Sequence, residues 1–134
     1  MNLYTQFETH QSAEINGIWI EYEGGSKFLV ARSGGANKKY INALAKARQP
    51  LRKQIMAGNL SEEKATEIIR RCFLKYCLLG WKNVADKADV VMEFSFENAM
   101  ILMTSLPELF NELVAQADLM ANYQNQERED DKKN

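Results

Sequence analysis

The sequence holds few of the residues that would point to an enzyme, a metal site or a membrane protein. It has one histidine, two cysteines and two prolines. Its longest uninterrupted apolar run, residues 99–103, has five residues, against the roughly 18 to 20 needed to cross a bilayer. We therefore expect no membrane span. Residues 1–6 lack the basic and apolar regions of a secretory signal, so we expect the protein to stay in the cytosol of its producing cell.

The scarce reactive residues do not form a site. His10 has no cluster of cysteines or carboxylates around it at metal-ligand spacing. Cys72 and Cys77 are five positions apart on one expected helix and point about 140° away from each other, so they form no unstrained disulfide. We expect both to be inert core residues. The sequence thus predicts a non-enzymatic protein with no metal and no cofactor.

The composition suits a single globular domain whose charge is unevenly distributed. The 134 residues are 46% hydrophobic and 26% charged, with a formal net charge of −1. Residues 37–71 carry nine Lys or Arg against three Glu, whereas residues 72–126 carry three against seven Asp or Glu. Either the two halves attract each other, or each faces a differently charged partner. The first interpretation is the simpler one.

Changes of pattern divide the chain into three parts. Residues 1–16 are polar and aperiodic and predict an N-terminal arm, ordered only by a partner or the core. Residues 17–122 predict one mainly helical domain that opens with a β-hairpin, because two β-branched and aromatic runs flank a Gly-Gly pair. Pairing Tyr22 with Lys27 sets the expected register. Residues 123–134 lack aliphatic side chains and predict a disordered, charged tail.

The rest of the domain has helical periodicity. We expect one helix over residues 37–56, bent at Pro50 or, failing that, broken there. A second helix begins after Ser61 and ends at Gly80, and two more follow Ser95 and Ser105. An acidic connection with a possible short strand at residues 90–92 precedes them. The expected fold class is therefore α+β and predominantly α-helical, with the hairpin packed on about four helices.

Apolar residues outside the main helical stripes are candidates for partner binding. Leu74 and Leu78 lie one turn apart, opposite the stripe that contains Phe73. They indicate either a helix packed between two layers or an exposed surface. Met100 and Met103 belong to a helical stretch that is apolar all round, which indicates burial on several sides or a partner.

A basic stripe on helix 37–56 provides the remaining candidates. Lys39, Lys46 and Lys53 repeat every seventh residue, with Arg48 and Arg52 nearby. Such a stripe is most simply a solvated helix face. It could also contact phosphates, although no aromatic residue is interleaved and the acidic remainder of the chain would repel a polyanion.

Several short segments, in their order, resemble a known family. These segments are Gly17-Ile18-Trp19, Phe28-Leu29-Val30-Ala31-Arg32, Gly80-Trp81-Lys82-Asn83-Val84, Phe94-Ser95-Phe96-Glu97-Asn98-Ala99 and Leu106-Pro107-Glu108-Leu109-Phe110. Over about residues 17–121 the chain resembles the tail assembly chaperones of long-tailed bacteriophages. It departs from them at residues 85–92, where an acidic turn containing Gly and Pro is expected.

The resemblance implies a non-enzymatic protein that is made in the host cell cytoplasm and is absent from the mature virion. Its partners would be the tape-measure protein, which it keeps soluble, and the tail-tube protein. A third partner would be a frameshift-extended form of the chain itself, and Lys132-Lys133 is a candidate position for the slippery site. The alternative is a small helical regulatory or nucleic-acid-associated phage protein that uses the basic helix 37–56. We do not expect nucleic acid to be a partner.

Overall fold

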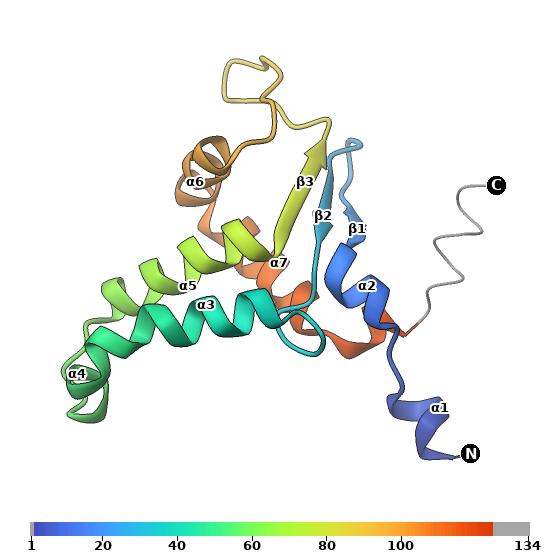
Figure 1. Ribbon diagram of the computed structural model, residues 1–134. Coiled ribbons are helices and arrows are strands. Elements are labelled where there is room, and N and C mark those ends of the chain that lie inside the picture. Colours follow the sequence, from blue (N-terminus) through green and yellow to red (C-terminus); the bar gives the residue numbers. More distant parts are fainter. Residues whose placement is uncertain (1, 125–134) are drawn as a thin grey trace.

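A small sheet and a set of helices make up the protein (Figure 1). The computed structural model describes residues 2–124. In chain order the elements are α1 (Leu3–Phe7), α2 (Gln11–Asn16), β1 (Ile18–Glu21), β2 (Lys27–Val30), α3 (Lys38–Arg48), the 3-10 helix η1 (Gln49–Leu51), α4 (Arg52–Met56), α5 (Glu62–Tyr76), β3 (Leu78–Lys82), α6 (Phe96–Ser105), α7 (Pro107–Asp118) and the 3-10 helix η2 (Met120–Tyr123). The predicted fold class, α+β and predominantly helical, is confirmed.

The predicted hairpin forms, but in a different register. Gly24 and Gly25 both have positive φ, as a tight turn requires. However, Glu21 rather than Tyr22 pairs with Lys27. The Tyr22 amide instead donates to the Ser26 carbonyl, which leaves a three-residue loop. A shift of one residue reverses the faces of one strand relative to the other, so Ile18 and Ile20 share a face with the buried Phe28 and Val30.

A third strand replaces the predicted end of helix 61–79. Helix α5 begins as expected, because the Ser61 side chain accepts a hydrogen bond from the Lys64 amide, but it ends at Tyr76. Gly80 does not adopt the left-handed conformation. It lies inside β3, which pairs antiparallel with β2 in a sheet of order β1-β2-β3. The hairpin therefore becomes a three-stranded sheet.

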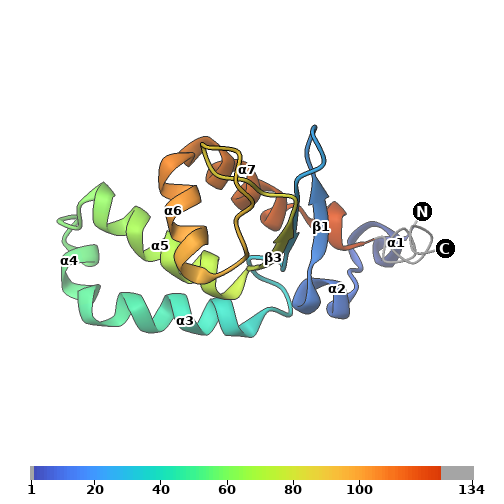
Figure 2. The ribbon, with the colours of Figure 1, turned by 90° about the horizontal axis from the view of Figure 1, so that it is seen from above.

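The core lies between one face of this sheet and the helices. Figure 2 shows α3, α5, α6 and α7 to one side of the strands, with α1 and α2 beyond β1. Phe28 and Trp81 meet edge to face, with ring centroids 6.0 Å apart. Phe73 of α5 meets Phe110 of α7 in the same way at 5.6 Å. Edge-to-face pairs of this kind add to the free energy gained by burial.

The N-terminal segment packs partly against this domain, so order through the core, one of the two routes predicted for the arm of residues 1–16, applies to its second half. Helix α2 contributes Ala13 to a small cluster with Ile18 and Tyr123. Its Glu14 carboxylate, almost fully buried, pairs with the Arg32 guanidinium. The aperiodic sequence concealed this order because, among residues 2–16, only Ala13 and Glu14 are buried.

The predicted start of the tail at residue 123 is wrong. Tyr123 is fully buried, and its hydroxyl donates to the Val30 carbonyl at 3.1 Å. The His10 amide donates to the Tyr123 carbonyl in turn. Residues 125–134, which include Lys132-Lys133 and the rest of the predicted tail, lie outside the described residues.

Three further local predictions have different outcomes. Ser95 caps α6 as expected, since its side chain accepts from the Asn98 amide. Ser105 does not cap α7; Leu106 occupies that position without a side-chain hydrogen bond. The expected strand at residues 90–92 is reduced to one bridge between Ala85 and Val91, which closes a protruding loop.

Candidate partner-binding surface

Pro50 creates a concave surface where α3 meets α4. It interrupts the predicted helix 37–56, because proline lacks an amide proton and its ring displaces the preceding turn. Helix α3 ends at Arg48, a short 3-10 helix follows, and α4 begins at Arg52. The predicted alternative of a break, rather than a single bent helix, is correct. Figure 1 shows α4 at the outer end of the α3 and α5 pair.

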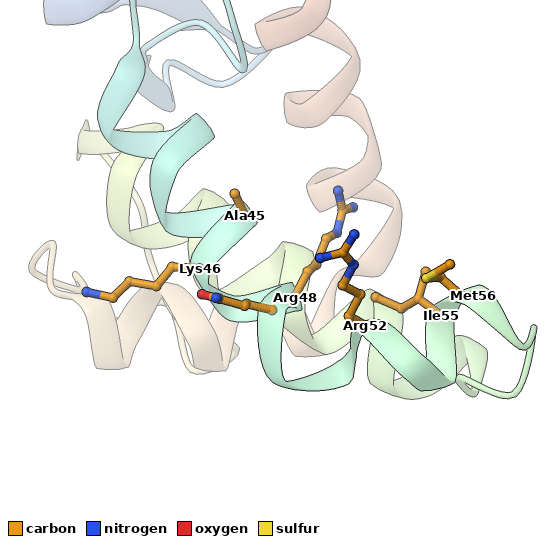
Figure 3. Close-up of a pocket in the computed structure, with 7 residues that line it drawn as sticks. Ala45, Lys46, Arg48, Arg52, Ile55 and Met56 are labelled. Atoms are coloured by element: carbon orange, nitrogen blue, oxygen red, sulfur yellow. The ribbon is translucent and has the colours of Figure 1, made fainter.

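This break produces what we call the tip hollow, an open cavity of about 520 Å³. It is lined by Ala45, Lys46, Arg48, Gln49, Arg52, Ile55 and Met56. Figure 3 shows Lys46, Arg48 and Arg52 along the two helices, with Ile55 and Met56 at the far end of the hollow. Ile55 is 41% exposed and Met56 is 77% exposed. The tip hollow thus combines cationic and apolar side chains on one accessible surface.

A second cavity, which we call the interhelical groove, lies between α3, α5 and α6 and measures about 640 Å³. Its apolar lining consists of Ala43, Ala47, Cys72, Tyr76 and Phe96. Its charged lining consists of Lys46, Arg71 and Lys75. Lys46 lines both cavities, so the two adjoin around α3.

The cations of both cavities are largely unpaired. Within residues 2–124 only two ion pairs occur, Arg32 with Glu14 and Arg71 with Glu67. The Arg71 Nε lies 3.5 Å from the Glu67 Oε1, and both side chains are about half exposed. The basic segment 37–71 is therefore not neutralised by ion pairs with the acidic segment 72–124. The simpler prediction, that the two halves satisfy each other, is not realised at ion-pair distance.

The structure removes three of the predicted apolar contact residues from the surface. Leu74 and Leu78 are each 1% exposed, and Met103 is fully buried. Leu74 packs inside because α5 lies between α3 and α6, and Leu78 does so because it belongs to β3 and not to a helix. Of the two interpretations, packing between layers is correct and an exposed leucine surface is wrong. Met100 is half-buried against the core.

The predicted basic residues remain accessible, but they do not act as one stripe. Lys39, Lys46 and Lys53 are all exposed. Of the three, only Lys46 lines the two cavities. Lys53 lies beyond the break at Pro50, on α4. The structure adds Arg71 and Lys75 from α5, along with exposed Ile55 and Met56. In a continuous helix 37–56, Ile55 would share the apolar face of Leu44 and Leu51, so its exposure follows only once the break is recognised.

Burial changes the pKa of the two cysteine thiols near the interhelical groove. Desolvation raises the pKa of the Cys72 thiol, and it raises the pKa of the Cys77 thiol further. Both are unpaired. Within residues 2–124, no three His, Cys, Asp or Glu residues gather where they could hold a metal ion. No helix in that range is long and apolar enough to cross a membrane.

Comparison with known proteins identifies the origin of the chain. Residues 35–134 match the model of the YdaY prophage protein family. Neither the curated proteins nor the solved structures contain a match. The matched range includes all of the residues that line the tip hollow and the interhelical groove. Since the match spans most of the sequence, this chain belongs to the YdaY prophage protein family and is phage-derived.

Proposed function

We propose that this protein is a non-enzymatic tail assembly chaperone that binds the tape-measure protein during phage tail assembly. The observation that carries the proposal is the tip hollow, where exposed Ile55 and Met56 lie beside Lys46, Arg48 and Arg52. Membership of a prophage family supports a phage role. The resemblance of residues 17–121 to tail assembly chaperones supports this particular role.

The chemistry of the tip hollow suits a helical client. A tape-measure protein of the kind that the resemblance implies is long, helical and apolar, and needs its apolar stripes covered until assembly. Exposed isoleucine and methionine side chains offer that cover, and methionine adapts to ridges of different shape. The surrounding cations hold acidic residues at the edge of such a stripe and exclude basic segments.

Further partners and the location follow from the same proposal. The chaperone would work in the host cell cytoplasm, recruit tail-tube subunits and be absent from the mature virion. A frameshift-extended form of the chain would act beside it. Repetitive lysine codons at Lys132-Lys133 followed by an overlapping reading frame would support that form, and their absence would exclude it without affecting the chaperone role.

The state of the thiols supports a non-enzymatic role. A cysteine nucleophile reacts as the thiolate. Burial raises the pKa of both Cys72 and Cys77, which keeps them protonated near neutral pH. They are therefore poor nucleophiles and instead fill the space between α5 and its neighbours.

Co-expression tests the chaperone proposal. The tape-measure protein of the same prophage is produced alone, with the wild-type chain, and with Ile55→Ser plus Met56→Ser. Wild type should increase the soluble fraction several-fold, and the double variant should lose most of that gain. The matched control is Val90→Ser plus Val91→Ser, which alters two other exposed apolar residues in the loop closed by the Ala85 and Val91 bridge. No gain with wild type would contradict the proposal, and equal losses in both variants would contradict the placement at the tip hollow.

The grouping of Lys46, Arg48 and Arg52 without a carboxylate in the lining also favours a second candidate, nucleic-acid binding. A titration with duplex DNA distinguishes the two functions. A nucleic-acid protein would bind with an affinity that falls steeply as salt rises. Substituting Ile55 and Met56 would leave that affinity unchanged.

A further inference from the structure

The interhelical groove has an aromatic, apolar floor that is open to solvent. Tyr76 of α5 and Phe96 of α6 contribute their rings, and Ala43 and Ala47 leave space on the α3 side because their side chains are small. All four residues are half-buried. A cavity of about 640 Å³ lies within the size range of sites that enclose a compact ligand. It has room for one large side chain from a partner.

The floor favours an aromatic side chain over an aliphatic one. Aromatic rings prefer edge-to-face contact, which adds to the free energy of burial. The core of this protein repeatedly uses that geometry, as between Phe73 and Phe110, with centroids 5.6 Å apart. Tyr76 and Phe96 offer two further rings to an incoming aromatic residue.

The cations at the rim of the interhelical groove favour a partner with acidic residues beside its anchoring side chain. Lys46 and Lys75 have no ion-pair partner among residues 2–124. The Lys75 Nζ lies 5.5 Å from the centroid of the Tyr76 ring, which places its charge next to the floor. The Arg71 contact with Glu67 is long and exposed, and such surface pairs contribute little to stability. Arg71 is therefore free to exchange partners.

The groove runs beside α3, which offers a partner helix a surface several turns long. Helix α3 has 11 residues, which corresponds to about 17 Å of axis. Lys46 connects the groove to the tip hollow. A helix running across both cavities would place one large side chain in the groove and further apolar residues over Ile55 and Met56.

We infer that the interhelical groove is the anchor site for an acidic amphipathic helix of the client protein, and that it accepts a phenylalanine or tryptophan flanked by Asp or Glu. This inference rests on the proposed function, since it specifies which client segments the chaperone recognises. It adds a specificity rule: apolar helical segments with basic flanks are not bound at this groove.

The test uses the full chain and a synthetic helical peptide of about 18 residues, or five turns. The peptide carries a leucine stripe, one central phenylalanine and glutamate flanks, and its affinity is measured by fluorescence anisotropy. Two matched peptides replace the phenylalanine with alanine or the glutamates with lysines. We expect the acidic phenylalanine peptide to bind, and each matched peptide to bind at least about tenfold more weakly.

Protein variants locate the site. Arg71→Gln plus Lys75→Gln should weaken binding of the acidic peptide about fivefold or more. Lys38→Gln plus Lys87→Gln removes the same charge from exposed positions outside both cavities, and should change the affinity less than about twofold. Circular dichroism confirms that each variant is folded.

Several outcomes would overturn the inference. These are equal binding of the alanine or lysine peptides, equal loss in the two charge variants, no binding of the acidic peptide, or its displacement by duplex DNA at lower concentration.

Co-expression distinguishes a failure of this inference from a failure of the proposed function. If Arg71→Gln plus Lys75→Gln still solubilises the tape-measure protein while Ile55→Ser plus Met56→Ser does not, the anchor site is wrong and the chaperone stands. If the peptide binds as expected and the tape-measure protein stays insoluble with wild type, the chaperone is wrong and the anchor site stands.

Discussion

Leu78 and Leu79 are neighbours in the chain but lie in opposite environments. Leu78 is 1% exposed and belongs to the main core, whereas Leu79 is 37% exposed. The reason is the alternation of a strand, in which successive side chains point to opposite faces. If the helix continued to Gly80, as predicted, Leu79 would lie on the core stripe with Cys72, and Leu78 would lie outside it. At the scale of single residues, the type of element decides which leucine stabilises the fold.

Truncating these two leucines tests that assignment. Leu78→Ala should lower the free energy of unfolding by about 2–5 kcal/mol, because it leaves a cavity in a fully packed region. Leu79→Ala should lower it by less than about 1 kcal/mol. Urea unfolding followed by tryptophan fluorescence measures both. A larger loss for Leu79→Ala would mean that residues 78–82 do not form the strand described.

Burial of a tyrosine hydroxyl makes the stability depend on alkaline pH. Desolvation, helped by Cys77 and Cys72, raises the pKa of Tyr40 to about 12, above its usual value near 10. The folded state therefore holds this proton more tightly than the unfolded state does. The resulting stability is complete below about pH 10 and is lost as the pH rises towards 12. Tyr40→Phe should reduce the loss of stability between these values, as measured by urea unfolding at several pH values; an unchanged pH profile would contradict the burial of this hydroxyl.

At the scale of elements, several local signals were reliable, although Ser105 does not cap α7. Ser61, Ser95 and the Gly24-Gly25 turn all behave as their sequence pattern predicts. The strand β3 was not predictable in this way. Its residues continue the apolar pattern of α5, and only pairing with β2, which is distant in sequence, makes them extended.

The candidate surface was predictable only where its residues are close together in the sequence. Lys46, Arg48 and Arg52 stood out as a basic cluster on one segment of chain. Their grouping with Ile55 and Met56 depends on the direction that the chain takes after Pro50. The interhelical groove combines three helices, so no periodicity within one segment reveals it.

The connection between β2 and α3 depends on one glycine. Gly35 has φ of +54°, and a Cβ there would collide with the Glu14 carboxylate that pairs with Arg32. Gly35→Ala should therefore lower the free energy of unfolding by more than about 1 kcal/mol. Gly34 has open space around it and no positive φ, so Gly34→Ala is the matched control and should have little effect. Chemical denaturation compares the two, and equal stability of both variants would show that Glu14 does not occupy this position.

The two N-terminal helices should contribute unequally to stability. Residues 2–8, which include α1, are exposed, while α2 buries Ala13 and Glu14. Deleting residues 2–9 should leave the melting temperature within a few degrees of wild type. Deleting residues 2–16 should lower it by about 5 °C or more, because Tyr123 loses its cover and Arg32 its partner. Calorimetry measures both, and similar melting temperatures for the two deletions would contradict the packing of α2.

At the scale of the whole molecule, the basic charge of the chain gathers on α3, α4 and α5, away from the hairpin and the N-terminal helices. Figure 1 shows that these helices extend to one end of the protein, with α4 at its tip. Since few of their cations have a partner within residues 2–124, this end presents an electropositive surface that includes exposed apolar residues. The acidic amphipathic client that we propose would complement such a surface.

Hydrogen–deuterium exchange on the full chain, alone and in complex with the tape-measure protein, tests most directly whether a client binds this surface. We expect slower exchange on binding over residues 43–56 and 71–76, which contain most of the lining of the tip hollow and the interhelical groove. Exchange in α1 should not change. Protection confined to α1 or to the loop of residues 83–95, with residues 43–56 unaffected, would contradict the account.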